Sequence, residues 1–347
     1  PPYMGSSRFN PFMSKWIKAN YPDEKGDLCF AFINRICGMK NPDGEAGITA
    51  TNSWMFLSSS EASRLKVLAS NEISSLVQLS VHGYKGIAAQ VFAFTLIDKQ
   101  PGGYKGGYIR LNDFDHHSLQ ESKTLEAIQN PDCGWFYRAD ASTFHDIPGS
   151  PIAYWANESL MALFNRSKLS AIGSAQEGIK TGDNEKFLRF WFEVQLGGTN
   201  INSTIPQAAK WQITSKAGES RRWFGAHYIV TNFADNGREM LATGHAAITA
   251  VHNFYRDAMT WNRIGGARLA FRYLPKGFIP NMGGLCFYPN NPCDLYCVIA
   301  FCNSSTAQTE LAILNPSTSF PPGTISNICG FELEANEKSQ IHDMASR

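Results

Sequence analysis

The chain has 347 residues and a formal net charge of +1, and 43% of its residues are hydrophobic. This length and composition predict a sizeable buried core divided between about two domains, and the balanced charge gives no global sign of a polyanionic partner. No apolar run approaches the length of a membrane span, so we expect no membrane partner. Eight cysteines at irregular spacing favour a reducing compartment over a disulfide framework, and we expect a cytoplasmic protein.

The chain begins with the tripeptide Pro1, Pro2 and Tyr3. Taken alone, this tripeptide is typical of an extended loop, because each proline fixes its own backbone angle and restricts the preceding residue. It also resembles the last three residues of the Asn-Pro-Pro-Tyr catalytic loop of amino-methylating DNA methyltransferases. That resemblance implies catalytic roles for all three residues, with the tyrosine ring stacked on a base flipped out of the duplex. One such stack returns roughly 1–3 kcal/mol, much of the few kcal/mol that flipping costs.

Five elements are predicted over the next hundred residues. Apolar residues at helical spacing predict a helix over 27–39, and the sequence Asn-Pro-Asp-Gly at 41–44 predicts a turn. After the turn we expect a buried strand, an amphipathic helix and two further strands, over residues 46–54, 59–69, 75–81 and 90–97. This order is typical of the second half of an α/β sheet that ends in a hairpin.

Segments spread along the whole chain resemble one family in the same order. They are residues 47–59, 147–155, 178–189, 272–279 and 314–317. Together they resemble the adenine-specific DNA methyltransferases of BREX phage-defence systems, the PglX type, which are related to type IIG restriction-modification enzymes. The resemblance implies a site-specific enzyme that methylates N6 of adenine with S-adenosylmethionine as donor. It also implies an α/β domain followed by an α+β domain. The α/β domain would be the second half of a Rossmann-like methyltransferase sheet, and the α+β domain would be a DNA target-recognition domain.

The resemblance places only a part of the cofactor site in this sequence. Asp27 and Leu28 match the family segment near the donor's adenine. The family's glycine-rich cofactor loop precedes the Asn-Pro-Pro-Tyr motif, and the glycines of 102–107 lack the Gly-x-Gly-x-x-Gly spacing, so we expect a flexible connector there. We therefore expect an incomplete S-adenosylmethionine pocket, weak cofactor binding and a chain truncated at both ends, with a missing N-terminal half as one possible partner. An incomplete sheet further predicts a first domain that is poorly stable or self-associates.

Phe92 and Phe94 lie two residues apart on a predicted strand, so both side chains point to the same face. In the resembled fold, a strand at this place supplies an aromatic ring that holds the flipped base against Tyr3. Two strand phenylalanines are also typical of an ordinary core. The sequence leaves open which of these roles applies.

The pattern divides the chain into four parts. Residues 1–112 are predicted to be a partial catalytic domain and residues 113–170 a helical connector interrupted by prolines. Residues 171–330, with short strands between Gly, Asn and Pro turns, are predicted to be the α+β target-recognition domain. The polar residues 331–347 are expected to be a flexible tail.

A basic region is the sequence's main sign of a nucleic-acid surface. Residues 205–285 contain ten cations and four anions, a net charge of +6, and seven of the cations are arginines, which can make bidentate contacts with guanine or phosphate. A solvated basic face is the alternative, although nearby aromatic residues favour base stacking. Thr181 or Asp183 could cap the segment that follows, and the exposed amides of their turn could also hold a phosphate. Our candidates for contacts with double-stranded DNA are Thr181, Asp183, Asn184, Arg189, Arg221, Arg222, Arg268, Arg272 and Lys276.

Other interpretations remain open at this point. The chain could be a non-catalytic DNA-binding specificity module that marks sites for other defence-system proteins. Ignoring the resemblance, its tryptophans Trp135, Trp155, Trp191 and Trp223 could bind glycans. Cys293, Cys297 and Cys302 lack the Cys-x-x-Cys spacing of a metal site, so we expect small core residues and no metal.

Overall fold

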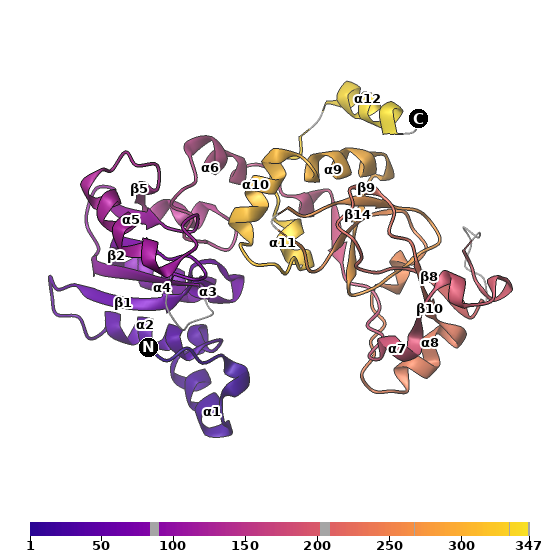
Figure 1. Cartoon of the computed structure of the whole chain (residues 1–347), viewed down its shortest axis with the longest axis horizontal. Helices are drawn as coiled ribbons and strands as arrows, with labels where there is room; N and C mark the ends of the chain where they lie inside the picture. The colour runs from indigo at the N-terminus through magenta and orange to yellow at the C-terminus, as the bar shows by residue number, and fades with distance from the viewer. Residues whose placement is uncertain (84–89, 202–208, 267, 333, 346–347) are drawn as a thin grey trace. The chain divides into compact units, whose positions relative to one another are not determined.

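The computed structural model describes residues 1–83, 90–201, 209–266, 268–332 and 334–345. They form two compact units, Pro1–Met161 and Ala162–Arg347 (Figure 1). Both units mix helices with sheets that contain antiparallel strands, which confirms the mixed α and β composition predicted from sequence. Within the described residues, no helix combines the length and the apolar character needed to cross a bilayer.

A five-stranded sheet lies at the centre of the first unit, in the order β1-β3-β2-β4-β5. β3 is antiparallel to both β1 and β2, β4 is parallel to β2, and β5 is antiparallel to β4. The pairing of β2 with β3 confirms the predicted hairpin. The strands are β1 (Ala46–Thr51), β2 (Asn71–Gln78), β3 (Val91–Asp98), β4 (Lys105–Arg110) and β5 (Phe136–Asp140).

The helices of the first unit follow the sequence pattern closely, with one exception. The predicted helices over 27–39 and 59–69 are α2 (Leu28–Cys37) and α4 (Glu61–Ser70). The predicted strand over 46–54 ends earlier, because α3 takes over at Asn52. The helices of this unit, including one that continues past its boundary, are α1 (Pro11–Asn20), α2, α3 (Asn52–Phe56), α4, α5 (His117–Gln129) and α6 (Glu158–Phe164).

The glycine-rich segment 102–107 is not only a connector, contrary to our expectation, because residues from Lys105 onward form β4. A Cβ atom on Gly106 would lie 2.0 Å from the main-chain oxygen of Ile73 in β2. Only glycine permits so close an approach of two strands. Gly106 therefore serves the close packing of β4 against β2.

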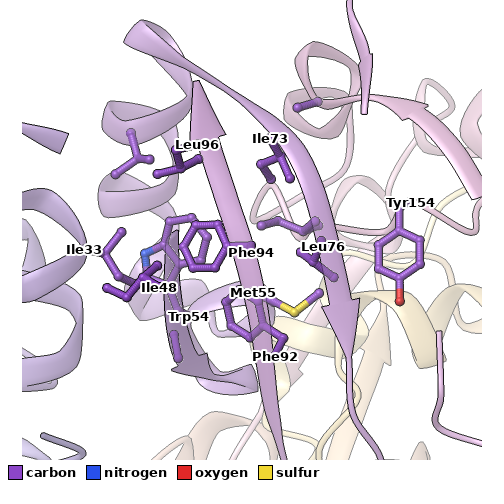
Figure 2. Packing of buried hydrophobic residues seen from close by; sticks show 14 of the residues in the cluster. Ile33, Ile48, Trp54, Met55, Ile73, Leu76, Phe92, Phe94, Leu96 and Tyr154 are labelled. Atoms are coloured by element: carbon purple, nitrogen blue, oxygen red, sulfur yellow. The ribbon is translucent and has the colours of Figure 1, made fainter. Parts of the chain in front are cut away.

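An apolar core lies between this sheet and its helices (Figure 2). Ile33 from α2, Trp54 and Met55 from α3, and Leu76 from β2 are all buried in it. Full burial of one such side chain stabilises the fold by roughly 1.5–3 kcal/mol.

The segment predicted to be a helical connector, 113–170, contributes largely to the first unit. It contains α5, but β5 extends the sheet and the Tyr154 hydroxyl donates a hydrogen bond to Gln78 Oε1 at 2.7 Å. Arg64 of α4, which is 0% exposed, donates hydrogen bonds to the main-chain oxygens of Trp54 at 2.5 Å and Ser150 at 2.9 Å, and to that of Gly149. These buried contacts explain why the boundary between the units falls at Met161 rather than near residue 112.

The second unit has two sheets, in the orders β13-β8-β10-β7 and β6-β14-β11-β12-β9. The first set is β13 (Ile279–Pro280), β8 (Trp211–Ser215), β10 (Ile229–Asn232) and β7 (Leu188–Phe190). The second set is β6 (Gly173–Gln176), β14 (Gly284–Pro289), β11 (Ala258–Asn262), β12 (Arg272–Leu274) and β9 (Trp223–Phe224). Its helices are α7 (Asn184–Phe187), α8 (Ala234–Leu241), α9 (Leu295–Cys302), α10 (Ser305–Leu314), α11 (Pro322–Ser326) and α12 (Ala335–Ala345).

The largest core of the second unit contains residues from α9 to α11 and from the five-stranded sheet. Cys297 and Cys302 are fully buried in this core, which confirms them as small core residues, whereas Cys293 is exposed. The tail predicted to be flexible contains α12. Lys338 Nζ lies 2.9 Å from the Asp294 carboxylate, which ties that helix to the start of α9.

Candidate active site and nucleic-acid surface

The Pro-Pro-Tyr loop lies beside the N-terminal part of β1. Tyr3 is half-buried against the core of the first unit, and its hydroxyl donates a hydrogen bond to the Thr49 main-chain oxygen at 3.5 Å. Pro1 and Tyr3 line a pocket of about 400 Å³, within the usual size range of small-ligand sites. Its other lining residues are Ile36, Gly47, Ile48, Thr49 and Val91.

Asp27 fixes this loop to α2. Its Oδ1 atom accepts hydrogen bonds from the main-chain nitrogens of Met4 at 3.3 Å and of Cys29 at 2.9 Å, the second of which caps the helix. The Leu28 main-chain nitrogen donates to the Met4 oxygen at 2.9 Å. The two residues expected at the cofactor site therefore hold the candidate catalytic loop in place.

Phe92 and Phe94 are 0% and 3% exposed, inside the core of the first unit (Figure 2). Their rings stack on each other with centroids 4.9 Å apart, and the Phe94 ring stacks on Trp54 at 5.4 Å. A base cannot reach either face while this core stays closed. The structure corrects the expectation of a base-stacking role here, and the ordinary-core alternative describes both residues.

The candidate residues near α7 make local hydrogen bonds. The buried Thr181 hydroxyl donates to Asn184 Oδ1 at 2.6 Å, and the exposed Asp183 caps α7 by accepting from the Lys186 main-chain nitrogen at 3.0 Å. Thr181 and Asn184 also line a cavity of about 370 Å³. Arg189 is half-buried and donates to the main-chain oxygens of Glu185 and Leu188.

The other cationic candidates differ in accessibility. Arg221, Arg222, Arg268 and Lys276 are exposed, and Arg221 lies 3.6 Å from the Glu219 carboxylate. Arg272 is only 2% exposed, so the structure corrects the expectation that it contacts DNA.

The Arg272 guanidinium is a structural group. Its Nη2 atom donates a hydrogen bond to Asn262 Oδ1 at 2.9 Å, between neighbouring strands of the sheet. Burial lowers the pKa of Arg272. The pKa of nearby His227 is lowered to about 4, mainly by burial of the imidazole and secondly by the positive charge of Arg272.

Two of the aromatic residues that lie near the arginines in the basic region form an exposed pair. Trp223 and Phe224 are each 56% exposed and directly follow the exposed arginines 221 and 222. Trp223 has a φ of 74°, a conformation that is strained for a bulky residue. Two exposed arginines are thus followed by two exposed aromatics, which are accessible for the stacking considered from the sequence.

Across the described parts of the chain, no group of three or more His, Cys, Asp and Glu side chains is placed to hold a metal ion. The first unit contains a tyrosine-lined pocket, and the second unit, taken by itself, contains exposed cations. Such cations suit contacts with phosphate oxygens and base edges.

Comparisons with known proteins agree with this description. A family model described as Eco57I restriction-modification methylase matches residues 1–84, which include the Pro-Pro-Tyr loop and β1. The adenine-specific methyltransferase PglX of Lacticaseibacillus casei (strain Zhang) is 32% identical over 343 residues, which cover 94% of this chain and 28% of that protein. The adenine-specific methyltransferase BrxX of Escherichia coli O9:H4 (strain HS) is 30% identical over 332 residues, covering 94% of this chain and 27% of that protein.

Solved structures show the same fold at low sequence identity. The type IIL restriction-modification enzyme MmeI, solved in complex with DNA, has a TM-score of 0.61 at 12% identity, covering 100% of this chain and 48% of that one. The type ISP restriction-modification enzyme LlaGI has a TM-score of 0.56 at 11% identity, covering 100% of this chain and 40% of that one.

Residues 1–84 are similar to the Eco57I restriction-modification methylases, and the chain shares its fold with the restriction-modification enzyme MmeI. The chain is also related to the adenine-specific DNA methyltransferases of the PglX and BrxX type, which confirms the resemblance drawn from its five segments. The chain spans less than a third of the length of these two relatives.

Proposed function

We propose that this chain forms the catalytic-loop and target-recognition parts of a site-specific DNA N6-adenine methyltransferase that acts in phage defence. The observation that carries the proposal is the position of Tyr3. Tyr3 and Pro1 line an open pocket, and both residues belong to the segment that the methylase family model matches. In this proposal the first sheet is the second half of a Rossmann-like methyltransferase sheet. Residues 171–330 form the recognition domain.

The proposed chemistry follows from the target atom. The amino nitrogen of adenine is a weak nucleophile because its lone pair is delocalised into the ring, so the site must bind it in a pyramidal form. The main-chain oxygen of Pro1 is the proposed acceptor for an amino hydrogen, and the Tyr3 ring is the proposed stacking face for the flipped base. S-adenosylmethionine supplies the methyl group when bound, and Asp27 and Leu28, at the start of α2, are the proposed lining residues of its site.

Recognition of the duplex is assigned to the second unit. The exposed Arg221, Arg222, Arg268 and Lys276 are the proposed contacts with phosphates and base edges. Phosphate contacts set position and give salt-dependent affinity, whereas bidentate arginine contacts set sequence. MmeI and DrdV, whose chains share this fold at TM-scores of 0.61 and 0.52, were each solved with DNA.

The test is a chimera in which this chain replaces the matching region of the L. casei PglX protein. We expect the chimera to form N6-methyladenine in duplex DNA, detected by mass spectrometry after digestion. Tyr3→Ala should lower the methylation rate about 5- to 150-fold, since a base stack is worth roughly 1–3 kcal/mol. Tyr3→Phe, which keeps the ring, should retain most of the rate.

Two results would contradict the proposal. A folded chimera that binds duplex DNA but forms no methyladenine would make the chain a specificity module only. Equal rates for Tyr3→Ala and the unmodified chimera would remove Tyr3 from the site.

A further inference from the structure

A tight turn in the second unit joins three segments that lie far apart in the sequence. The main-chain nitrogen of Met282 donates to Ile179 O at 2.9 Å, and that of Asn281 donates to Ser215 O at 3.2 Å. The main-chain nitrogen of Arg263 donates to Gly283 O at 3.0 Å. The turn therefore joins the segments that contain residues 180, 216 and 263 through backbone hydrogen bonds.

Each of these three segments contributes one cation to the same cavity, of about 370 Å³. The cations are Lys180, Lys216 and Arg263. Arg263 pairs with the Glu177 carboxylate, whereas neither lysine forms an ion pair within the described parts of the chain. With Glu177 included, this cluster has a net charge of +2. Lys216 is half-buried, and burial lowers the pKa of its ammonium group, so the cavity holds a partly desolvated charge.

The remaining lining of the cavity is mostly small or polar. It consists of Thr181, Gly182, Asn184, Asn281, Met282 and Gly283. The Asn184 amide oxygen accepts from the Thr181 hydroxyl, which leaves the amide N–H groups of Asn184 as donors. Gly182 has a φ of +74°, and a Cβ atom there would lie 2.9 Å from the Ala246 main-chain nitrogen, so a larger residue would strain this wall.

We propose that this cavity is a phosphate-binding site, which takes one backbone phosphate of duplex DNA and so positions the duplex on the second unit. That the phosphate comes from DNA rests on the proposed function. That the cavity binds a phosphate rests only on the residues that line it. Two unpaired ammonium groups and a guanidinium provide charge-assisted donors from three directions, as a tetrahedral anion requires. A phosphate contact of this kind carries no sequence preference.

The first experiment measures the affinity of the full chain for duplex DNA over a range of salt concentrations. Each phosphate contact contributes about 0.9 to the slope of log affinity against log salt. We expect Lys216→Met to reduce the slope by about 0.9 for every duplex sequence tried, and Lys216→Arg to leave it unchanged. Lys168→Met removes an exposed lysine outside the cavity and is the matched control.

The second experiment does not depend on DNA. The chain is acetylated with and without inorganic phosphate at equal ionic strength, and modification of each lysine is measured by mass spectrometry. We expect phosphate to protect Lys180 and Lys216, but not Lys168. Acetylation equal in both solutions would overturn the phosphate site.

Together the experiments separate this inference from the proposed function. Protection by phosphate without any DNA binding would support the site and contradict the proposed function. DNA binding with the same slope in Lys216→Met and in the unmodified chain would overturn the assignment of a DNA phosphate to the cavity.

Discussion

Asp27 Oδ1 lies 3.3 Å from the main-chain nitrogen of Met4, so one carboxylate joins the residue after Tyr3 to the first turn of α2. Asp27→Ala removes this hydrogen bond and the helix cap. We expect a loss of about 1 kcal/mol in the free energy of unfolding, the usual cost of losing an N-cap side chain. Asp27→Asn keeps an acceptor oxygen and should lose less. Urea unfolding of both variants checks this, and equal losses would show that the carboxylate charge matters rather than its hydrogen bonds.

Arg64 should be essential for the stability of the first unit. Arg64→Met keeps much of the side-chain volume but leaves the main-chain oxygens of Trp54, Gly149 and Ser150 without their donor. Each buried group left unpaired costs about 1–3 kcal/mol, so we expect a loss on the order of 3 kcal/mol or more. Urea unfolding measures it, with the exposed Arg138→Met as the control. A loss below about 1 kcal/mol would contradict the prediction.

Loss of charge at two arginines of the second unit should have different effects on the melting temperature. Arg272→Gln should lower the melting temperature, because it disturbs a buried hydrogen bond to Asn262. Arg222→Gln changes an exposed side chain and should leave the melting temperature unchanged. If Arg222 contacts a phosphate, the same variant should reduce the salt slope of DNA binding by about 0.9. An unchanged slope would remove Arg222 from the interface.

Glu310 should make stability depend on pH. It is 0% exposed and accepts a hydrogen bond from the Cys329 main-chain nitrogen, and burial raises the pKa of its carboxyl group to about 7 from an ordinary value of 4.5. The folded state binds the proton of the Glu310 carboxyl group more tightly than the unfolded state does. The stabilisation from this protonation is therefore complete below pH 4.5 and is lost as the pH rises through 7. The expected change is about 3 kcal/mol, at 1.36 kcal/mol per pKa unit.

The matched variant for that prediction is Glu310→Gln, which stays neutral at every pH. The difference in unfolding free energy between this variant and the unmodified chain should grow in favour of glutamine between pH 5 and 8. Urea unfolding at several pH values measures it. A constant difference over that range would contradict the raised pKa.

The sequence predicted those parts of the fold that local pattern controls. The alternating and helical apolar patterns located α2, α4 and the hairpin of β2 and β3 within a few residues. β4 was missed because its glycines serve a close approach to Ile73, a long-range packing demand that a local pattern does not show. α12 was missed because its ion pair with Asp294 depends on tertiary contact.

The candidate site was predictable only where residues are adjacent in sequence. Pro1, Pro2 and Tyr3 could be recognised because they are consecutive and match the end of a catalytic motif. Arg272 lies in a buried strand and Arg222 lies just before a strand at the surface, a difference in accessibility that residue type alone does not show. Lys180, Lys216 and Arg263 meet only through the turn at 281–283, which no spacing in the sequence indicates.

The position of β3 between β1 and β2 has a consequence for folding during synthesis on the ribosome. β1 and β2 are made first, yet neither has its shared partner until Val91–Asp98 has left the exit tunnel. Until then, both strands have unpaired edges that are open to pairing with other chains. The nascent chain therefore passes through an interval in which its own sheet cannot yet cover the edges of these strands.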